Sequence, residues 1–317
     1  MAGPAHSHSD EFSRATHRHG EIPNWSNRTR PFYIAIALNL TLFVSTLVAG
    51  IITGSLTLVG NAIHVLSDVA GLMIGIIASW LASRPASIRH SFGLVRMEVL
   101  GALATTLMLA GVAVFIFYQG VLSLGTNSAS AVHDSVQLTL FGILGVVISV
   151  LSAFIFASGN AETLMSKANI LHFVSDALGW IFAIAAGLAL RYLGLTHADA
   201  IASILIALII LIGSIKIVAS IVNILLDSAP SAQSVKSIEE MLLSTSGIQE
   251  VHHLHVWRLT SSKVTLSAHL VMSEGTTLHD AQQISIGIKE RLYHEFEIDH
   301  ATLELECHLC DSPTHNS

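Results

Sequence analysis

The stretch HVLSD at His64–Asp68 returns 108 positions later as HFVSD at His172–Asp176. Each copy places an imidazole and a carboxylate four residues apart inside a long apolar run, so on an α-helix the two side chains share one face, about one turn apart. Ionisable groups are costly in hydrocarbon and usually serve a function where they occur. The two stretches therefore predict two membrane helices that each carry a polar pair.

Small residues continue the polar face of each helix. Gly71 and Gly75 follow the first pair at helical spacing, and Gly179 and Ala183 follow the second. Such strips let two membrane helices approach closely, which predicts that the two helices pack on each other and that their four polar groups converge. A single pair could equally serve only to hydrogen-bond one helix to another. Two copies with the same spacing favour a functional site.

The composition is that of a membrane protein: 52% of residues are hydrophobic, 12% are charged and the mean hydropathy is +0.64. Apolar runs of spanning length cover 32–52, 56–83, 96–122, 134–158, 168–190 and 198–226. These runs predict six transmembrane helices. The net charge of −7 is spread over loops and tail, and no basic patch typical of nucleic-acid binding stands out.

Basic residues outside the helices indicate the orientation. They precede the first helix or lie in the second-to-third and fourth-to-fifth loops: Arg14, Arg18, Arg28, Arg30, Arg84, Arg89, Arg96 and Lys167. The opposite loops hold only Arg191, between helices five and six. The positive-inside rule therefore predicts that both termini face the cytoplasm.

The N-terminal segment, residues 1–30, predicts a mobile polar tail rather than a signal peptide. It contains four spaced histidines: His6, His8, His17 and His19. Weak metal capture by these histidines is the alternative to a merely polar tail. Pro31 then suits the first position of the first helix, where its missing N–H costs nothing. The membrane domain is expected over 31–228.

A soluble domain is expected over 229–317, because Pro230 ends the apolar runs and charges return after it. Apolar residues recur at helical spacing over 235–242 and 278–292, and they favour strands over 251–259, 264–272 and 301–305. The predicted order is α-β-β-α-β, a small α+β domain. The segment from His90 to Glu98 reads as an interfacial anchor at least as readily as a gate.

The soluble domain is rich in possible metal ligands. A hairpin turning near 260–262 brings His252 and His269 within about two positions of register. Glu306, Cys307 and Cys310 end the third strand, and the C-x-x-C spacing suits zinc. One such pair supplies only two ligands, so another histidine or another subunit must complete that shell. A disulfide is not expected on the cytoplasmic side.

Two imidazoles and two carboxylates match the tetrahedral nitrogen and oxygen shell of Zn²⁺, whereas Mg²⁺ and Ca²⁺ prefer oxygen ligands alone. The two carboxylates also cancel the charge of the ion, which matters in a low-dielectric membrane. Without the ion the carboxylates repel each other and an imidazole can accept a proton, so protons are natural replacements for zinc. The chemistry predicts exchange of metal for protons.

The six-helix plan, the paired H-x-x-x-D motifs, the segment Arg84–Glu98 with its Phe92-Gly93, and the sequence VHHLHVW at Val251–Trp257 together resemble the cation diffusion facilitator family. The likeness covers about 30 to 310. Paired H-x-x-x-D resembles the zinc-transporting branch, whereas members with Asp in place of the first His accept more metals. Many members carry Asp where this chain has Asn61.

The resemblance implies a Y-shaped homodimer, a ferredoxin-like or metallochaperone-like αββαβ tail, and metal/proton antiport out of the cytosol. It implies transport-site ligands and tail ligands: His64, Asp68, His172 and Asp176 in the membrane, and His252, His269 and Glu306 in the tail, where bound metal is regulatory. Cys307 and Cys310 with an N-terminal histidine resemble the zinc-binding ending of vesicular zinc transporters. We expect tail metal to tighten the dimer.

The sequence fits functions other than transport less well. An intramembrane zinc protease is disfavoured because no H-E-x-x-H occurs; His294-Glu295 lies in the soluble tail and lacks the second histidine. A membrane metal sensor would make the helix pairs structural, and efflux of Co²⁺, Cd²⁺ or Ni²⁺ is a broader alternative to zinc. The expected location is a bacterial inner membrane, with an organelle membrane as second choice.

Overall fold

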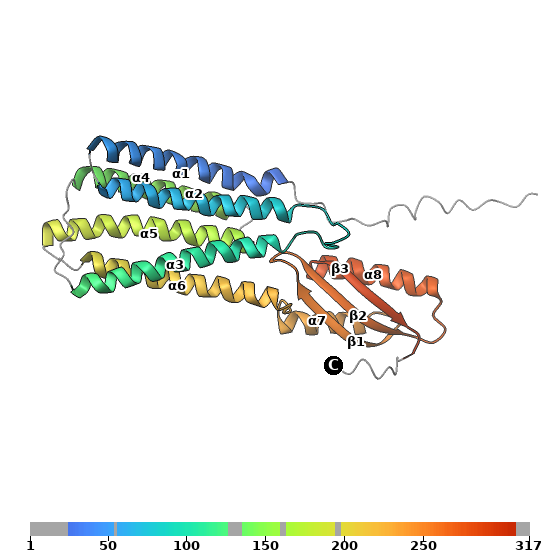
Figure 1. The fold of residues 1–317 in the computed structure, drawn as a ribbon. Helices are drawn as coiled ribbons and strands as arrows, with labels where there is room; N and C mark the ends of the chain where they lie inside the picture. Colours follow the sequence, from blue (N-terminus) through green and yellow to red (C-terminus); the bar gives the residue numbers. More distant parts are fainter. Residues whose placement is uncertain (1–24, 54–55, 126–134, 159–162, 194–197, 309–317) are drawn as a thin grey trace, which may run out of the picture.

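A computed structural model describes residues 25–53, 56–125, 135–158, 163–193 and 198–308. It consists of a bundle of six long helices with a small mixed α/β domain at one end (Figure 1). The bundle helices are α1 Trp25–Thr53, α2 Leu56–Ala82, α3 Met97–Gly125, α4 Ser135–Ser158, α5 Leu164–Leu193 and α6 Ala198–Leu225. These helices occupy the six predicted apolar runs.

The bundle helices are long enough to cross a membrane. They contain 24 to 30 residues, and at 1.5 Å per residue they exceed the roughly 30 Å hydrocarbon core. Within the described residues, α1, α2, α3, α4 and α6 contain stretches of sufficient length and hydropathy to span it. The sixth helix, α5, carries the second polar pair.

The predicted start of the first helix is wrong. α1 begins at Trp25, and Pro31 lies inside it rather than at its first position. The carbonyl that Pro31 leaves without a helical N–H partner belongs to Asn27, close to the helix end, where the lost bond disturbs few others. The four N-terminal histidines lie outside the described residues.

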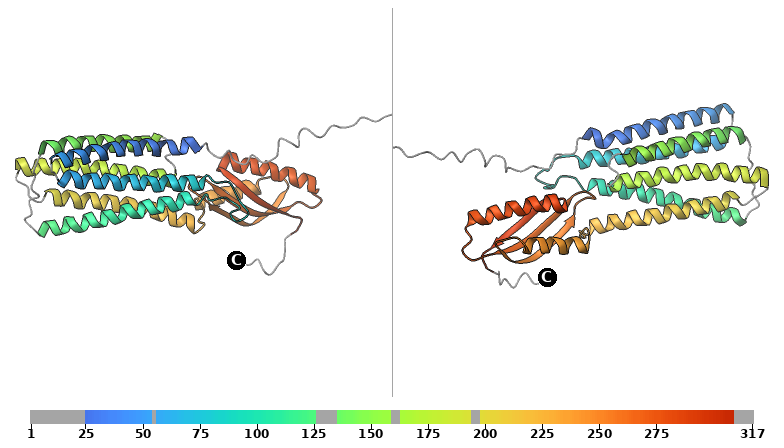
Figure 2. Two further views of the ribbon diagram at one scale, coloured as in Figure 1. Left: turned by 45° about the horizontal axis from the view of Figure 1, so that its top comes forward. Right: turned by 180° about the vertical axis from the view of Figure 1, so that it is seen from behind.

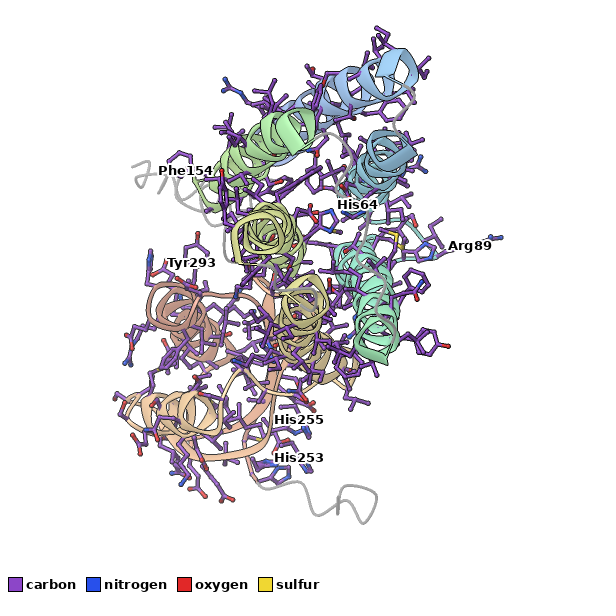
Figure 3. The ribbon with its side chains drawn as sticks, turned by 90° about the vertical axis from the view of Figure 1, so that its left-hand side faces the viewer. His64, Arg89, Phe154, His253, His255 and Tyr293 are labelled. Carbon is purple, nitrogen blue, oxygen red and sulfur yellow. The ribbon has the colours of Figure 1, made fainter. Side chains whose placement is uncertain are left out.

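The surface of the bundle is apolar, as a lipid-facing surface must be. On α4, Leu140 is 65% exposed and Phe154 67% exposed, and Phe154 projects outward from the bundle in Figure 3. The polar side chains of Ser149 and Ser152 on the same helix are buried. This arrangement reverses that of a soluble helix and keeps polar groups away from hydrocarbon.

The sequence predicts that α2 and α5 pack on each other through small residues, and the structure contradicts this prediction. α2 packs mainly against α1 and α3, and α5 against α4 and α6. A Cβ on Gly75 would clash with the ring of Phe32 on α1, and one on Gly71 would lie 3.0 Å from Met108 on α3. The small residues of α2 therefore accommodate large side chains of its own neighbours. The side chain of Ala183 lies outside those described.

The C-terminal domain has the predicted α-β-β-α-β order: α7 Ala232–Leu243, β1 Ile248–Arg258, β2 Val264–Met272, α8 Leu278–Phe296 and β3 Ile298–Glu306. Ser231 and Thr277 cap the two helices by accepting bonds from Ser234 N and Asp280 N. The sheet order is β1-β2-β3, with β1 antiparallel and β3 parallel to β2. Both helices pack against one face of the sheet around a core that includes Leu242, Leu266 and Leu292.

The C-terminal domain lies against one end of the bundle (Figure 2), and among the described residues the following contacts involve this junction. Arg96, just before α3, pairs with Asp227, just after α6. Ser261 in the β1–β2 turn accepts a hydrogen bond of 3.3 Å from Leu164 N at the start of α5. Phe92 meets His300 of β3 edge to face, with ring centroids 5.6 Å apart. The segment 90–98 thus contacts the C-terminal domain.

Candidate metal sites

The two repeated stretches lie inside α2 and α5 and direct their polar side chains toward each other. Figure 3 shows His64 between α2 and α5 in a view along the bundle. One ligand atom each from His64, Asp68 and Asp176 lies within 4.8 Å of the others. Residues separated by more than a hundred positions therefore form one cluster. His172 contacts both of its carboxylates, and the four residues together are hereafter the membrane cluster.

The distances in the membrane cluster suit a small tetrahedral ion. His172 Nε2 lies 3.3 Å from Asp68 Oδ1 and 3.5 Å from Asp176 Oδ2, and His64 Nε2 lies 3.9 Å from Asp176 Oδ1. Two ligand atoms that each lie about 2.0–2.1 Å from a tetrahedral Zn²⁺ are about 3.3 Å apart. Three of the four side chains are thus close to ligand geometry.

The ring nitrogen Nε2 of His172 lies within ion-pair distance of both carboxylates. Its Nε2 is buried, and neither short contact has the geometry of a hydrogen bond. A buried polar atom in that situation is costly unless it serves another interaction. A cation held by both carboxylates and this nitrogen would satisfy it.

The side chains of the membrane cluster differ in exposure. The His64 side chain is 48% exposed, whereas those of Asp68 and His172 are 6% and 16% exposed. Carboxylates buried this far require a partner of opposite charge. His64 therefore forms the accessible edge of a mostly enclosed anionic site.

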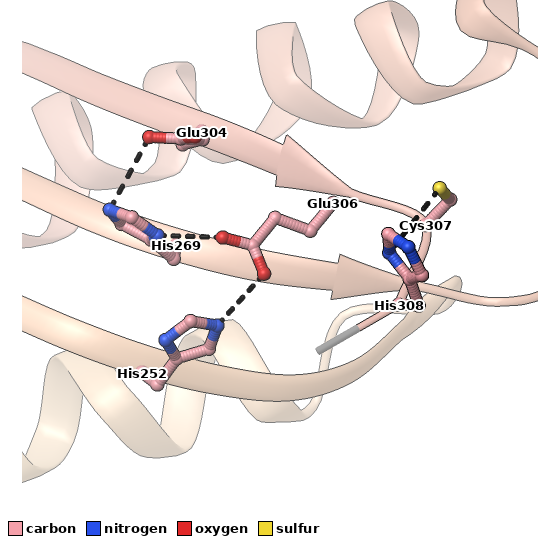
Figure 4. Close-up of polar contacts among 6 residues, drawn as sticks. All are labelled: His252, His269, Glu304, Glu306, Cys307 and His308. Carbon is pink, nitrogen blue, oxygen red and sulfur yellow. Dashed lines mark hydrogen bonds and ion pairs between the residues drawn. The ribbon is translucent and has the colours of Figure 1, made fainter. Parts of the chain in front are cut away.

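A second cluster lies on the sheet of the C-terminal domain (Figure 4). His252 on β1 and His269 on β2 are directly paired in register, which confirms the prediction that they lie within about two positions of each other. Glu306 at the end of β3 joins them: its Oε2 lies 3.0 Å from His252 Nε2 and its Oε1 lies 2.7 Å from His269 Nδ1. The three residues, hereafter the sheet cluster, offer ligand atoms within 4.8 Å of one another.

The Glu306 carboxylate is held in its charged form. Burial raises its pKa, but hydrogen bonds from His269 and His252 and their charge outweigh that effect, so the pKa lies below its ordinary value. Glu304 adds a contact of 3.4 Å between its Oε2 and His269 Nε2. The sequence did not single out Glu304, although its alternation with Glu306 along β3 places both on one face.

The C-x-x-C pair is only partly described. Cys307 is exposed, and its Sγ lies 3.8 Å from His308 Nδ1 (Figure 4). Cys310 lies outside the described residues, as do the N-terminal histidines proposed as its partners. Within the described part of the chain, Cys307 does not belong to either group of candidate metal ligands.

Comparison with known proteins matches both domains to families. The family described as "Cation efflux transmembrane domain" matches residues 32–226, and that described as "Cation efflux protein, cytoplasmic domain" matches residues 230–308. Together they cover both clusters.

Individual relatives match over most of their length. The chain is 32% identical to "Metal cation efflux system protein CzcD" of Cupriavidus metallidurans, over 89% of this chain and 88% of the relative. It is 30% identical to "Cadmium, cobalt and zinc/H(+)-K(+) antiporter" of Bacillus subtilis, over 92% and 91%. It is 29% identical to "Zinc transporter ZitB" of Escherichia coli, over 98% and 95%.

Proposed function

Because the chain belongs to the cation diffusion facilitator family of cation efflux proteins, we propose that it exports Zn²⁺ from the cytosol in exchange for protons. The observation that carries the proposal is the membrane cluster, in which the imidazole nitrogens of His64 and His172 lie 3.3 to 3.9 Å from carboxylate oxygens of Asp68 and Asp176. Two nitrogen and two oxygen ligands suit Zn²⁺ and are a poor match for Mg²⁺ or Ca²⁺. The zinc ion is here the transported substrate.

Proton exchange follows from the charge of the cluster. Zn²⁺ neutralises Asp68 and Asp176, and its departure leaves two carboxylates close together in a nearly enclosed site. Protons restore neutrality most simply, since both imidazoles and carboxylates accept them. We propose that the cluster alternates between the two sides of the membrane, with zinc bound on one side and protons on the other.

The direction of transport rests on orientation. The C-terminal domain matches a cytoplasmic domain, and it lies at the same end of the bundle as the basic segment before α3 (Figure 1). Both termini are proposed to face the cytoplasm. The bacterial relatives support an inner membrane as the location. We also propose three parts of the chain: an N-terminal cytoplasmic tail over 1–30, a membrane domain over 31–228 and a cytoplasmic domain over 229–317.

The C-terminal domain is proposed to join two copies of the chain and to bind regulatory metal at the sheet cluster. Its match to the cytoplasmic domain of cation efflux proteins supports the first role. The hydrogen-bonded set of His252, His269 and Glu306 supports the second. Cys307 and Cys310 with an N-terminal histidine form a further proposed site.

Transport of other divalent transition metals is the second candidate function. Two observations favour it: one relative is named for cadmium, cobalt and zinc, and His64 is exposed at the edge of the membrane cluster. A flexible ligand at an open edge tolerates ions of different size and geometry. Zinc remains the primary proposal because of the balance of nitrogen and oxygen ligands.

The experiment is zinc flux into proteoliposomes under an imposed pH gradient. Intact protein should drive zinc uptake, and Asp68→Ala and His172→Ala should each abolish it while the protein remains folded and monodisperse. His279→Ala and Asp299→Ala, exposed residues of the C-terminal domain outside both clusters, are matched controls that should retain flux. Competition by Co²⁺ and Cd²⁺ in the same vesicles tests the second candidate. Flux that survives Asp68→Ala would contradict the proposal.

A further inference from the structure

The face of the C-terminal sheet that carries the sheet cluster is the one without helices. Leu254 and Val256 of β1 and Leu270 of β2 pack into the core beneath α7 and α8. Strand side chains alternate between faces, so His269, next to Leu270, points the other way. Figure 4 shows His252, His269 and Glu306 together on this open face.

β1 departs from regular alternation next to His252. His252 pairs with His269 and His255 pairs with Ser267, so three steps along β1 match two along β2. This is a β-bulge with one extra residue on β1. As a consequence Val251 and Leu254 both pack against the core although they are three residues apart. The two residues between them, His252 and His253, are both left on the open face.

The residue at the bulge has a strained backbone. His253 has φ of +49°, in the left-handed region, and bulges of this kind usually place glycine there. A histidine with its Cβ pays a steric penalty in that conformation, and such strain is typical of functional sites. The sequence conveys none of this, because HH in an alternating strand predicts one ring on each face.

The three rings are spaced as imidazoles around one ion. The ring centroid of His253 lies 5.2 Å from that of His252 and 5.1 Å from that of His269, and the latter two are 5.1 Å apart. In a tetrahedral site with Zn–N of about 2.0–2.1 Å, two imidazole centroids are about 5.2 Å apart. All three pairs therefore match this geometry.

We propose that His253 is a fourth metal ligand, which completes with His252, His269 and Glu306 a site of three imidazoles and one carboxylate within a single protomer. The inference rests on the regulatory metal site proposed above and defines its shell. The nitrogens of His253 do not join the three ligand atoms that already lie within 4.8 Å of one another, so the proposal requires its ring to rotate about the side-chain bonds when the ion binds. Glu304, 3.4 Å from His269 Nε2, holds the second nitrogen of that ring, as carboxylates often do for ligand histidines.

A complete shell within one protomer has a consequence for binding. The ion needs neither a residue of a second copy nor Cys307 to complete its shell, so a single protomer holds all four ligands. Three nitrogens and one oxygen favour Zn²⁺ and Co²⁺ over Ca²⁺ and Mg²⁺. Co²⁺ is therefore a suitable probe, since tetrahedral Co²⁺ absorbs visible light strongly.

The test is Co²⁺ titration of the full chain in detergent, followed by visible absorption. The background carries His64→Ala, His172→Ala, Cys307→Ser and Cys310→Ser, which remove the membrane cluster and the C-x-x-C pair. We expect one tetrahedral Co²⁺ per protomer. His253→Gly and His253→Asn, both compatible with the left-handed backbone, should weaken Co²⁺ binding at least about tenfold and alter the absorption bands. His279→Asn on the exposed start of α8 is the control and should change neither.

Thermal melting without metal separates a ligand from a structural residue. His253→Gly should melt no lower than its parent, because glycine relieves the strain. Unchanged Co²⁺ affinity and absorption in both His253 variants would overturn this inference while leaving the three-residue site intact. If the background protein binds no Co²⁺ at all, the regulatory site fails together with this inference, and zinc flux by the intact chain remains the separate test of transport.

Discussion

At the scale of single residues, identical motifs have different environments. His64 and His172 occupy the same position in their repeats, yet His64 is 48% exposed and His172 only 16%. The repeat specifies which side chains face the cluster, and the neighbouring helices determine how deeply each is buried. A ligand at the open edge suits entry of an ion, and enclosed carboxylates suit its retention.

Glu306 provides a prediction for the metal-free protein. Because its pKa is lowered in the folded state, its contribution to the free energy of unfolding is complete above the ordinary pKa of 4.5 and is lost as the pH falls through the folded value. With metal removed by EDTA, Glu306→Gln should lower the stability of the C-terminal domain by about 1 to 2 kcal/mol near neutral pH. The difference should vanish on acidification.

Denaturant unfolding between pH 7 and pH 3, with parent and variant in parallel, measures this difference. Glu304→Gln is the matched control, because Glu304 lies on the same strand with its side chain 65% exposed and should show little effect. A difference between parent and Glu306→Gln that grows as the pH falls would contradict the expected sign.

At the scale of elements, glycine on α2 serves the packing of α1. Phe32 lies against Gly75, is 4% exposed, and meets Phe156 edge to face with centroids 4.9 Å apart. The ring is therefore fixed between three helices and cannot move away from an added methyl group. α2 and α5 consequently meet through their polar side chains, with other helices supporting each of them.

Gly75→Ala should destabilise the bundle by about 1 to 3 kcal/mol through overpacking against Phe32, although alanine favours helix by up to about 1 kcal/mol. Phe32→Leu in the same chain should restore part of the loss. Gly179→Ala on α5 is the control, because nothing lies within 4 Å of its Cβ position. Unfolding of Gly75→Ala, of its combination with Phe32→Leu and of Gly179→Ala in mixed detergent micelles measures these changes in stability. A larger loss for Gly179→Ala would instead indicate close packing along the α5 strip.

At the scale of the whole molecule, the junction between the two domains is small and polar. The Arg96 and Asp227 side chains are 40% and 54% exposed, so their pairing contributes only about 0 to 1 kcal/mol to stability. The position of this ion pair matters more for the orientation of the domains than for stability, because Arg96 precedes α3 and Asp227 follows α6. Together with the Ser261 contact to the start of α5, the junction touches three helices of the bundle.

Arg96→Glu and Asp227→Arg should each broaden the distance distribution between the domains, and the double exchange should narrow it again, because opposite charges then face each other. Spin labels on cysteines placed at Ser158 of α4 and Gln283 of α8 measure this distance, in a Cys307→Ser/Cys310→Ser background diluted with unlabelled protein. Arg291→Glu breaks an ion pair within α8 and should have no effect. A double exchange as broad as the single variants would show that the pairing does not orient the domains.

The sequence by itself determined the six helices, the α-β-β-α-β tail and most candidate ligands, because apolar periodicity and length report which faces are buried and how long each element is. It placed His252 and His269 together because a short turn limits the register. It did not determine which helices pack together: small residues permit close approach without specifying the partner, and large rings of α1 and α3 fill those positions. The repeated motifs predicted that the polar pairs of α2 and α5 converge, but only the tertiary structure decided which helices support them. It also set the junction at Arg96 and turned His253 to the open face, since one extra residue at a bulge leaves no trace in strand alternation.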